Sequence, residues 1–227
     1  MTDFILVLPI LLFSVVAHEY AHGWTALRQG DPTALMLGRL TLNPLPHIDP
    51  VMSVLVPVGL WVLSHGAFTF GAARPVPVNP RNFRNYRRGD LVVSSAGIVM
   101  NLLLAAACAG VFVLLGVAGH ALPGAAGALR TLQRMMFFGI FLNYILAVFN
   151  LVPVPPLDGS HLFYHLLPPA LGARYRAVGR LGVVLVLATF MVPGLSRVWT
   201  WLLWPAEMAS RLTVTVIGGF ALPAVLR

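Results

Sequence analysis

The sequence lacks lysine altogether, and its 227 residues include one cysteine and two glutamates. The single cysteine, Cys108, excludes a disulfide framework and any metal site built from several thiolates. Charged residues make up 10% of the chain against 58% hydrophobic residues, and the mean hydropathy is +0.84. Soluble domains have about a quarter charged residues. The shortage of charge therefore excludes an ordinary soluble domain and predicts an all-α polytopic membrane protein.

Length limits how such a membrane protein can be organised. At about 20 residues a span, the chain has room for five or six membrane segments and no accessory soluble domain. We expect one integral-membrane domain over residues 1–227, with a core at about 4–167 and C-terminal membrane segments at about 178–222. The N-terminus lacks the basic region of a signal peptide, so the first apolar segment is expected to remain in the mature protein.

The net charge of +8 comes entirely from arginine. A basic chain can bind nucleic acid, but in a chain this apolar the arginines at loop ends are expected to face anionic headgroups and set the topology. No nucleic-acid partner is expected.

The first predicted helix, Phe4–Leu27, has only three charged or imidazole side chains, His18, Glu19 and His22. The two histidines are four residues apart, so they lie one turn apart on one helix face. Zinc binds two histidine nitrogens at this spacing, and a glutamate beside the first histidine can accept a proton from water. Such groups are costly in an apolar helix. The pattern indicates a metal-dependent site, the alternative being a chance match with structural histidines.

A short segment after this helix, Met36–Leu42, has a partly alternating apolar pattern that predicts a strand or extended segment near the site. Asn43-Pro44-Leu45-Pro46 closes it. Two interpretations stay open: an ordinary loop, or an edge strand that pairs with an unwound substrate by β-augmentation.

A clear span at Leu91–Val117 has Gly97 and Asn101 on one face. Glycine allows another helix to approach closely, and asparagine offers a buried amide. These residues fit a packing seam with an interhelical hydrogen bond or a role at the site.

The next span, Leu132–Val152, runs into Pro153, Pro155 and Pro156, which cannot continue a helix. Unwound backbone at membrane depth is tolerated where it is buried in protein or lines a wet cavity. Asp158 follows directly, and it is the predicted third metal ligand.

Two more histidines, His161 and His165, follow Asp158 at a spacing of four residues. They fit either alternative ligands or a helix at the membrane interface. The region from Leu181 onward fits two spans, or one span and an interfacial helix.

A shared metal site constrains the topology. His18 and His22 lie near the C-terminal end of the first helix, and Asp158 lies just beyond the C-terminal end of another, so both ends must reach the same side. This holds if Val51–Phe70, an apolar segment interrupted by proline and glycine, is re-entrant and does not cross. The N-terminus is then outside and the site faces the cytoplasm.

The distribution of arginine supports the same topology. With a re-entrant Val51–Phe70, ten arginines lie on the cytoplasmic side of the membrane and only Arg130 and Arg134 lie on the other side, which agrees with the positive-inside rule. Those ten are Arg28, Arg39, Arg74, Arg81, Arg84, Arg87, Arg88, Arg174, Arg176 and Arg180.

Three motifs, taken in order, resemble the site-2 protease family of intramembrane zinc metalloproteases, peptidase family M50. They are the H-E-x-x-H pattern at 18–22, Gly97-x-x-x-Asn101, and the proline-rich segment from Asn150 to Gly159. The resemblance covers about residues 10–165 and is to the compact branch without PDZ or CBS domains. One departure is Ile98, where family members often have proline.

The resemblance implies one zinc ion per chain and six functional side chains. These are His18, His22 and Asp158 as zinc ligands, Glu19 as the base that activates water, and Asn150 and Asn101 as groups that position substrate or stabilise the transition state.

The implied activity is regulated intramembrane proteolysis in the cell membrane, the hydrolysis of peptide bonds within or near transmembrane helices of substrate proteins. The expected partners are those substrates and the lipid bilayer. The alternative is a metal transporter or a metal-binding membrane scaffold, because histidine and aspartate inside spans also suit ion pathways. A transporter needs polar residues that continue to both faces, often in repeated halves. Here the polar groups gather toward one side.

Overall fold

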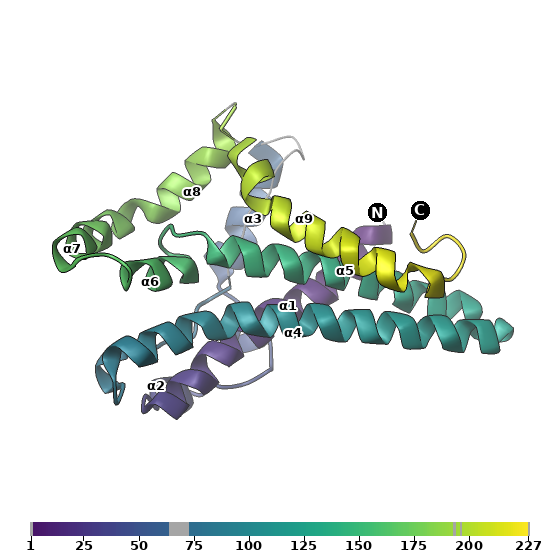
Figure 1. Cartoon of the computed structure of the whole chain (residues 1–227), viewed down its shortest axis with the longest axis horizontal. Coiled ribbons are helices and arrows are strands. Elements are labelled where there is room, and N and C mark those ends of the chain that lie inside the picture. Colours follow the sequence, from purple (N-terminus) through teal and green to yellow (C-terminus); the bar gives the residue numbers. More distant parts are fainter. Residues whose placement is uncertain (1, 64–72, 193, 196, 227) are drawn as a thin grey trace.

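A computed structural model describes residues 2–63, 73–192, 194–195 and 197–226, and all regular structure within these ranges is helical (Figure 1). This confirms the predicted all-α fold. The α-helices are α1 (Thr2–Gln29), α2 (Thr33–Met36), α3 (Val56–Leu63), α4 (Tyr86–Ala121), α5 (Ala126–Leu151), α6 (Asp158–Tyr164), α7 (Pro169–Val178), α8 (Gly182–Met191) and α9 (Arg197–Ile217). Short 3₁₀ or π turns lie at Leu45–His47, Pro50–Leu55, Pro80–Asn82, Pro123–Ala125, Gly179–Leu181 and Gly218–Phe220.

Three of the described helices are long and apolar enough to cross a membrane: Leu6–Gln29 in α1, the whole of α4, and Pro123–Leu151, which includes α5. The three pack against one another (Figure 1). Their shared core includes Phe112 and Ile140, both fully buried. The three-helix bundle is the frame that supports the site, and the predicted count of five or six membrane segments stays a prediction.

Helix α4 begins where α1 ends. The side chain of Asn85 accepts a hydrogen bond from the Arg88 N–H at 2.9 Å and caps the helix, so α4 starts at Tyr86, five residues before the predicted Leu91. The Arg84 N–H donates to the Gln29 carbonyl at 2.9 Å. The chain from 30 to 85 therefore leaves and returns at the same end of the bundle.

Within the segment predicted to be re-entrant, residues 51–63 are helical: they belong to the π turn Pro50–Leu55 and to α3, which follows it. Residues 64–72 lie outside the described residues. The re-entrant path at Val51–Phe70 therefore stays a prediction.

Met36–Leu42 is not a strand, so that prediction is wrong, and residues 37–42 form a loop, the interpretation left open beside it. Met36 ends α2, and Gly38 turns the chain with a positive φ of 65°. The Arg39 N–H then donates to the Ala34 carbonyl at 2.8 Å, which closes the helix C-terminus. The alternation in the sequence was incomplete, and a glycine in the left-handed conformation ends a helix at low cost. The β-augmentation hypothesis loses its basis with the strand.

The proline segment behaves as predicted. Helix α5 ends at Leu151, and residues 152–157 form an irregular turn before α6. Side chains of this turn pack against the C-terminal helices in a cluster with Val186 and Trp199. Helix α9 packs against α5. Helix α8 has ten residues, and its length of about 15 Å is half of the hydrocarbon thickness of a bilayer.

A buried carboxylate fastens the chain that returns to α4. Asp31 is fully buried just beyond α1. It accepts bonds from the Thr33 N–H at 3.1 Å, the Asn79 N–H at 2.6 Å and the Asn82 amide at 2.7 Å, and also from the Thr33 hydroxyl. Burial opposes ionisation, but these bonds outweigh it and hold the pKa of Asp31 below its usual value.

Replacing Asp31 with asparagine should lower the free energy of unfolding in detergent by about 2–3 kcal/mol at neutral pH. Every partner of this side chain donates to it. An amide in its place has one oxygen acceptor fewer and faces the Asn79 N–H or the Asn82 amide with a second donor. Because the pKa is lowered by folding, the carboxylate stabilises the protein above about pH 4 and loses this effect as the pH falls through its folded value.

Thermal melting of wild type and Asp31→Asn across pH checks this. The difference in melting temperature should be largest at neutral pH and shrink in acid. Glu207→Gln is the control, because it removes a carboxylate charge from an exposed ion pair with Arg211, which contributes little to stability. Equal changes in melting temperature for the two substitutions would contradict the stabilising role of the Asp31 carboxylate.

Candidate metal centre

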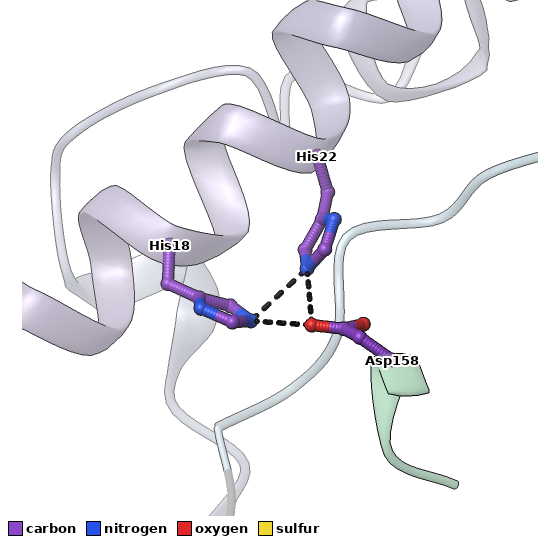
Figure 2. A group of neighbouring side chains, drawn as sticks. All are labelled: His18, His22 and Asp158. Carbon is purple, nitrogen blue, oxygen red and sulfur yellow. Dashed lines mark hydrogen bonds and ion pairs between the residues drawn. The ribbon is translucent and has the colours of Figure 1, made fainter. Parts of the chain in front are cut away.

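Helix α1 presents two buried imidazoles on one face. His18 and His22 are one turn apart, with exposed fractions of 7% and 8%. Their Nε2 atoms are 3.0 Å apart and point to the same place (Figure 2).

A carboxylate from a distant part of the chain completes the group. Asp158 is the first residue of α6, and its Oδ2 lies 3.2 Å from the Nε2 atom of each histidine (Figure 2). The prolines end α5 here, and Gly159 allows the chain to fold back tightly. A Cβ on Gly159 would lie 2.1 Å from the Leu151 carbonyl oxygen. The sequence thus brings Asp158 to the histidines by a sharp turn that only glycine fits.

A chain of hydrogen bonds fixes which nitrogen of His18 bears the proton. The Asn143 Nδ2 donates to the Gly139 carbonyl and to the Ser14 hydroxyl, both at 2.9 Å, so its Oδ1 is free to accept. That oxygen accepts from the Asn101 Nδ2 at 2.9 Å, which turns the Asn101 Oδ1 toward His18. The His18 Nδ1 must then donate to the Asn101 Oδ1 at 2.6 Å. Its Nε2 is left with a lone pair.

His22 is fixed in the same way by the backbone. Its Nδ1 lies 2.7 Å from the Val93 carbonyl oxygen, which can only accept. The Nε2 of His22 therefore also offers a lone pair, as a metal-binding histidine does when its other nitrogen donates.

Three acceptors thus converge on one point. In the neutral imidazoles the Nδ1 bonds leave a lone pair on both Nε2 atoms, and the buried Asp158 Oδ2 has no hydrogen-bond partner among the described residues. The three ligand atoms lie within 4.8 Å of one another. Lone pairs held this close in an apolar setting repel unless a cation lies between them. Two imidazoles and a carboxylate suit zinc, with one coordination position left open.

The carboxylate of Glu19 lies beside this group on α1. Its Oε2 accepts a hydrogen bond from the Val76 N–H at 2.7 Å. Val76 belongs to the irregular stretch 73–79, which is held by Arg39: the guanidinium of Arg39 donates to the Arg74 carbonyl at 2.9 Å. The loop therefore orients the predicted base from outside the helix.

Residues 6–192 match the family model for peptidase family M50. This chain belongs to that family. It is 37% identical over 201 residues to the protein named "Putative zinc metalloprotease YwhC" of Bacillus subtilis, covering 88% of this chain and 85% of the relative. It is 32% identical over 194 residues to the protein named "Putative zinc metalloprotease Rip2" of Mycolicibacterium smegmatis, covering 86% and 70%. The Rip2 protein of Mycobacterium tuberculosis is also 32% identical, over 193 residues.

No solved structure matches the chain. As an M50 member the chain is a metalloprotease and a membrane protein, and the names of its relatives refer to zinc. The family resemblance inferred from the three motifs is confirmed.

The two asparagines implied by the M50 motifs occupy different places. Asn101 lies fully buried behind His18, with both ends of its amide hydrogen-bonded. Asn150 lies half-buried on the last turn of α5, where its Nδ2 donates to the Leu146 carbonyl at 2.9 Å.

The histidines that follow Asp158 turn away from this group. The Nδ1 of His161 and the Nε2 of His165 contact the carboxylate of Asp90 instead. Sequence reasoning missed Asp90, and it missed Asn143 and Ser14 as well. A signal was present for two of them, because a carboxylate and an amide within long apolar helices need polar partners.

Gly97 is the position where α4 passes closest to the imidazoles. A Cβ added there would lie 2.4 Å from His18 Cε1 and 2.5 Å from the Nε2 atom of either histidine. Gly97→Ala should therefore displace both rings and weaken zinc binding by roughly tenfold or more. Zinc affinity is measured in detergent by competition with a chromophoric chelator.

Gly110→Ala is the matched control, since it lies on the same helix with nothing within 4 Å of the added Cβ. Both substitutions raise helix propensity equally. If Gly97→Ala bound zinc as tightly as Gly110→Ala, the metal would not lie between these imidazoles.

Proposed function

We propose that this M50 member is an intramembrane protease that cleaves peptide bonds within or near transmembrane helices of other membrane proteins. The observation that carries the proposal is the convergence of three acceptors beside Glu19, two of them from the apolar helix α1 and the third from the start of α6. His18, His22 and Asp158 would hold one zinc ion. When bound, zinc polarises a carbonyl and lowers the pKa of water toward ~7.

Glu19 is the proposed general base. It is adjacent to His18 and one turn or less from both imidazoles, so its carboxylate is within reach of the open coordination position. It would accept the proton of the attacking water and return it to the leaving amine. The Val76 N–H bond to Oε2 supports this role, since it orients the carboxylate and leaves the second oxygen for the proton.

The asparagines take separate roles in this proposal. Asn101 is buried, and both ends of its amide are occupied, which supports an orienting role toward His18 in place of contact with substrate. Asn150 is the next-to-last residue of α5, close to the turn that leads to Asp158, and we retain it as the group that positions substrate or stabilises developing charge.

The placement in the membrane follows from the helices and the arginines. We propose a multi-pass protein of the cell membrane in which residues 1–227 form one peptidase domain with its core at about 4–167. The metal centre lies toward the end of α1 that joins α4. The segment between these helices contains four arginines, at positions 39, 74, 81 and 84, and the first turn of α4 adds those at 87 and 88. The positive-inside rule then puts the centre toward the cytoplasm and the N-terminus outside.

Glu19→Gln should retain zinc and lose cleavage of a transmembrane-helix substrate by at least about a hundredfold, because the amide cannot accept the proton. Asp158→Ala should lose both, because it removes a ligand. Zinc content and cleavage are measured on the same purified samples in detergent. The control is Glu207→Gln, which changes the other glutamate of the chain, an exposed residue paired with Arg211 at 2.6 Å.

Cleavage by Glu19→Gln at the rate of the control would exclude Glu19 as the base. Full zinc content in Asp158→Ala would remove that ligand. Zinc in wild type without any cleavage, across several substrates, would favour a metal-handling function.

A further inference from the structure

A second polar cluster lies at the start of α4, outside the metal group. Asp90 is buried, with 4% of its surface exposed. Its Oδ1 lies 3.1 Å from the His161 Nδ1, and its Oδ2 lies 2.7 Å from the His165 Nε2. One carboxylate thus binds two imidazoles from the segment that begins with Asp158.

Packing alone does not explain why a carboxylate is buried between two imidazoles. A buried carboxylate loses its hydration, and an apolar contact of the same shape would serve as well or better for stability alone. What a carboxylate adds is direction, because each of its oxygens fixes one imidazole at a defined angle.

Helix α6 needs such direction. It has seven residues and follows an unwound segment, so neither its own hydrogen bonds nor a continuous helix fixes its orientation. Asp158 is its first residue and His165 is its C-cap. Contacts with Asp90 at 161 and 165 therefore fix the axis and the rotation of the element that carries the third ligand.

Other contacts fasten the same two elements. The Arg87 guanidinium donates to the His165 carbonyl at 3.4 Å, and the rings of Tyr86 and His165 lie 5.8 Å apart. Arg176 of α7 lies 3.6 Å above the Tyr164 ring and donates to the Tyr86 hydroxyl. The first turn of α4 is therefore joined to α6 at several points, with Asp90 at the buried centre.

Asp90 lies on the same face of α4 as the residues that contact His18 and His22. Residues 90, 93, 97 and 101 are three or four apart and form one stripe of the helix. The Val93 carbonyl orients His22, Gly97 makes room for both rings, and Asn101 orients His18. Asp90 stands in the same stripe and contacts the helix of the remaining ligand.

We propose that Asp90 is a positioning residue of the metal centre: through His161 and His165 it orients α6 so that Asp158 Oδ2 meets the two histidine nitrogens. The proposal rests on the proposed zinc site, and Asp90 itself contacts neither metal nor substrate. One helix then sets the direction of all three ligands.

The test is zinc affinity, measured by chelator competition on the full chain in detergent, for Asp90→Asn, His161→Phe and His165→Phe. Each should weaken zinc binding by about 10–100-fold, the range for groups that orient ligands. The apoprotein melting temperature is measured beside it. His120→Phe is the control, because His120 is exposed at the far end of α4 and its Nδ1 contacts the Gly116 carbonyl of its own helix.

The same substitution in a variant that already lacks the Asp158 carboxylate separates a positioning role of Asp90 from a general loss of folded structure. In Asp158→Asn the two imidazoles still bind zinc weakly, and adding Asp90→Asn should change that affinity by less than about threefold, since the ligand that Asp90 orients has been replaced. An equal loss in both backgrounds, or no loss in the wild-type background, would overturn the proposal. Absence of zinc binding in wild type would instead refute the zinc site itself.

Discussion

Two imidazoles and a carboxylate can share one cation only if each turns a lone pair to the same point, and a single face of α4 imposes that condition here. The Asn101 Oδ1 and the Val93 carbonyl each take the Nδ1 proton of one histidine, at 2.6 and 2.7 Å. The absence of a side chain at Gly97 lets this face approach the rings closely. α1 supplies the histidines, but α4 determines which atoms they present.

The apolar setting makes these polar contacts decisive. Ser14, Asn101 and Asn143 are fully buried, and their amides and hydroxyl are hydrogen-bonded in series from a backbone carbonyl to His18. A buried polar network that is satisfied throughout holds one arrangement, because each alternative leaves an unpaired group in a medium without water. The network therefore makes the tautomer of His18 a property of the fold and not of the solvent.

The sequence was most informative where chemistry and local rules coincide. The spacing of His18 and His22, the helix end before Pro153 and the all-α class follow from helix geometry and proline stereochemistry. The strand at Met36–Leu42 failed because a left-handed glycine outweighed a weak alternation. The contacts of Asp90 with His161 and His165 and the hydrogen bond from Val76 to Glu19 join residues that are 57 to 75 positions apart in the sequence. No local sequence pattern encodes such pairs.

The central claim is that the metal is held by two imidazoles and one carboxylate supplied by α1 and α6. X-ray absorption spectroscopy at the zinc edge of the purified, zinc-loaded protein tests it most directly, because multiple scattering counts imidazole ligands. The account predicts two imidazoles at about 2.0–2.1 Å and oxygen in the remaining positions at about 2.0–2.2 Å. One imidazole would contradict the orientation of the pair by α4. Three would mean that His161 or His165 replaces Asp158 as a ligand.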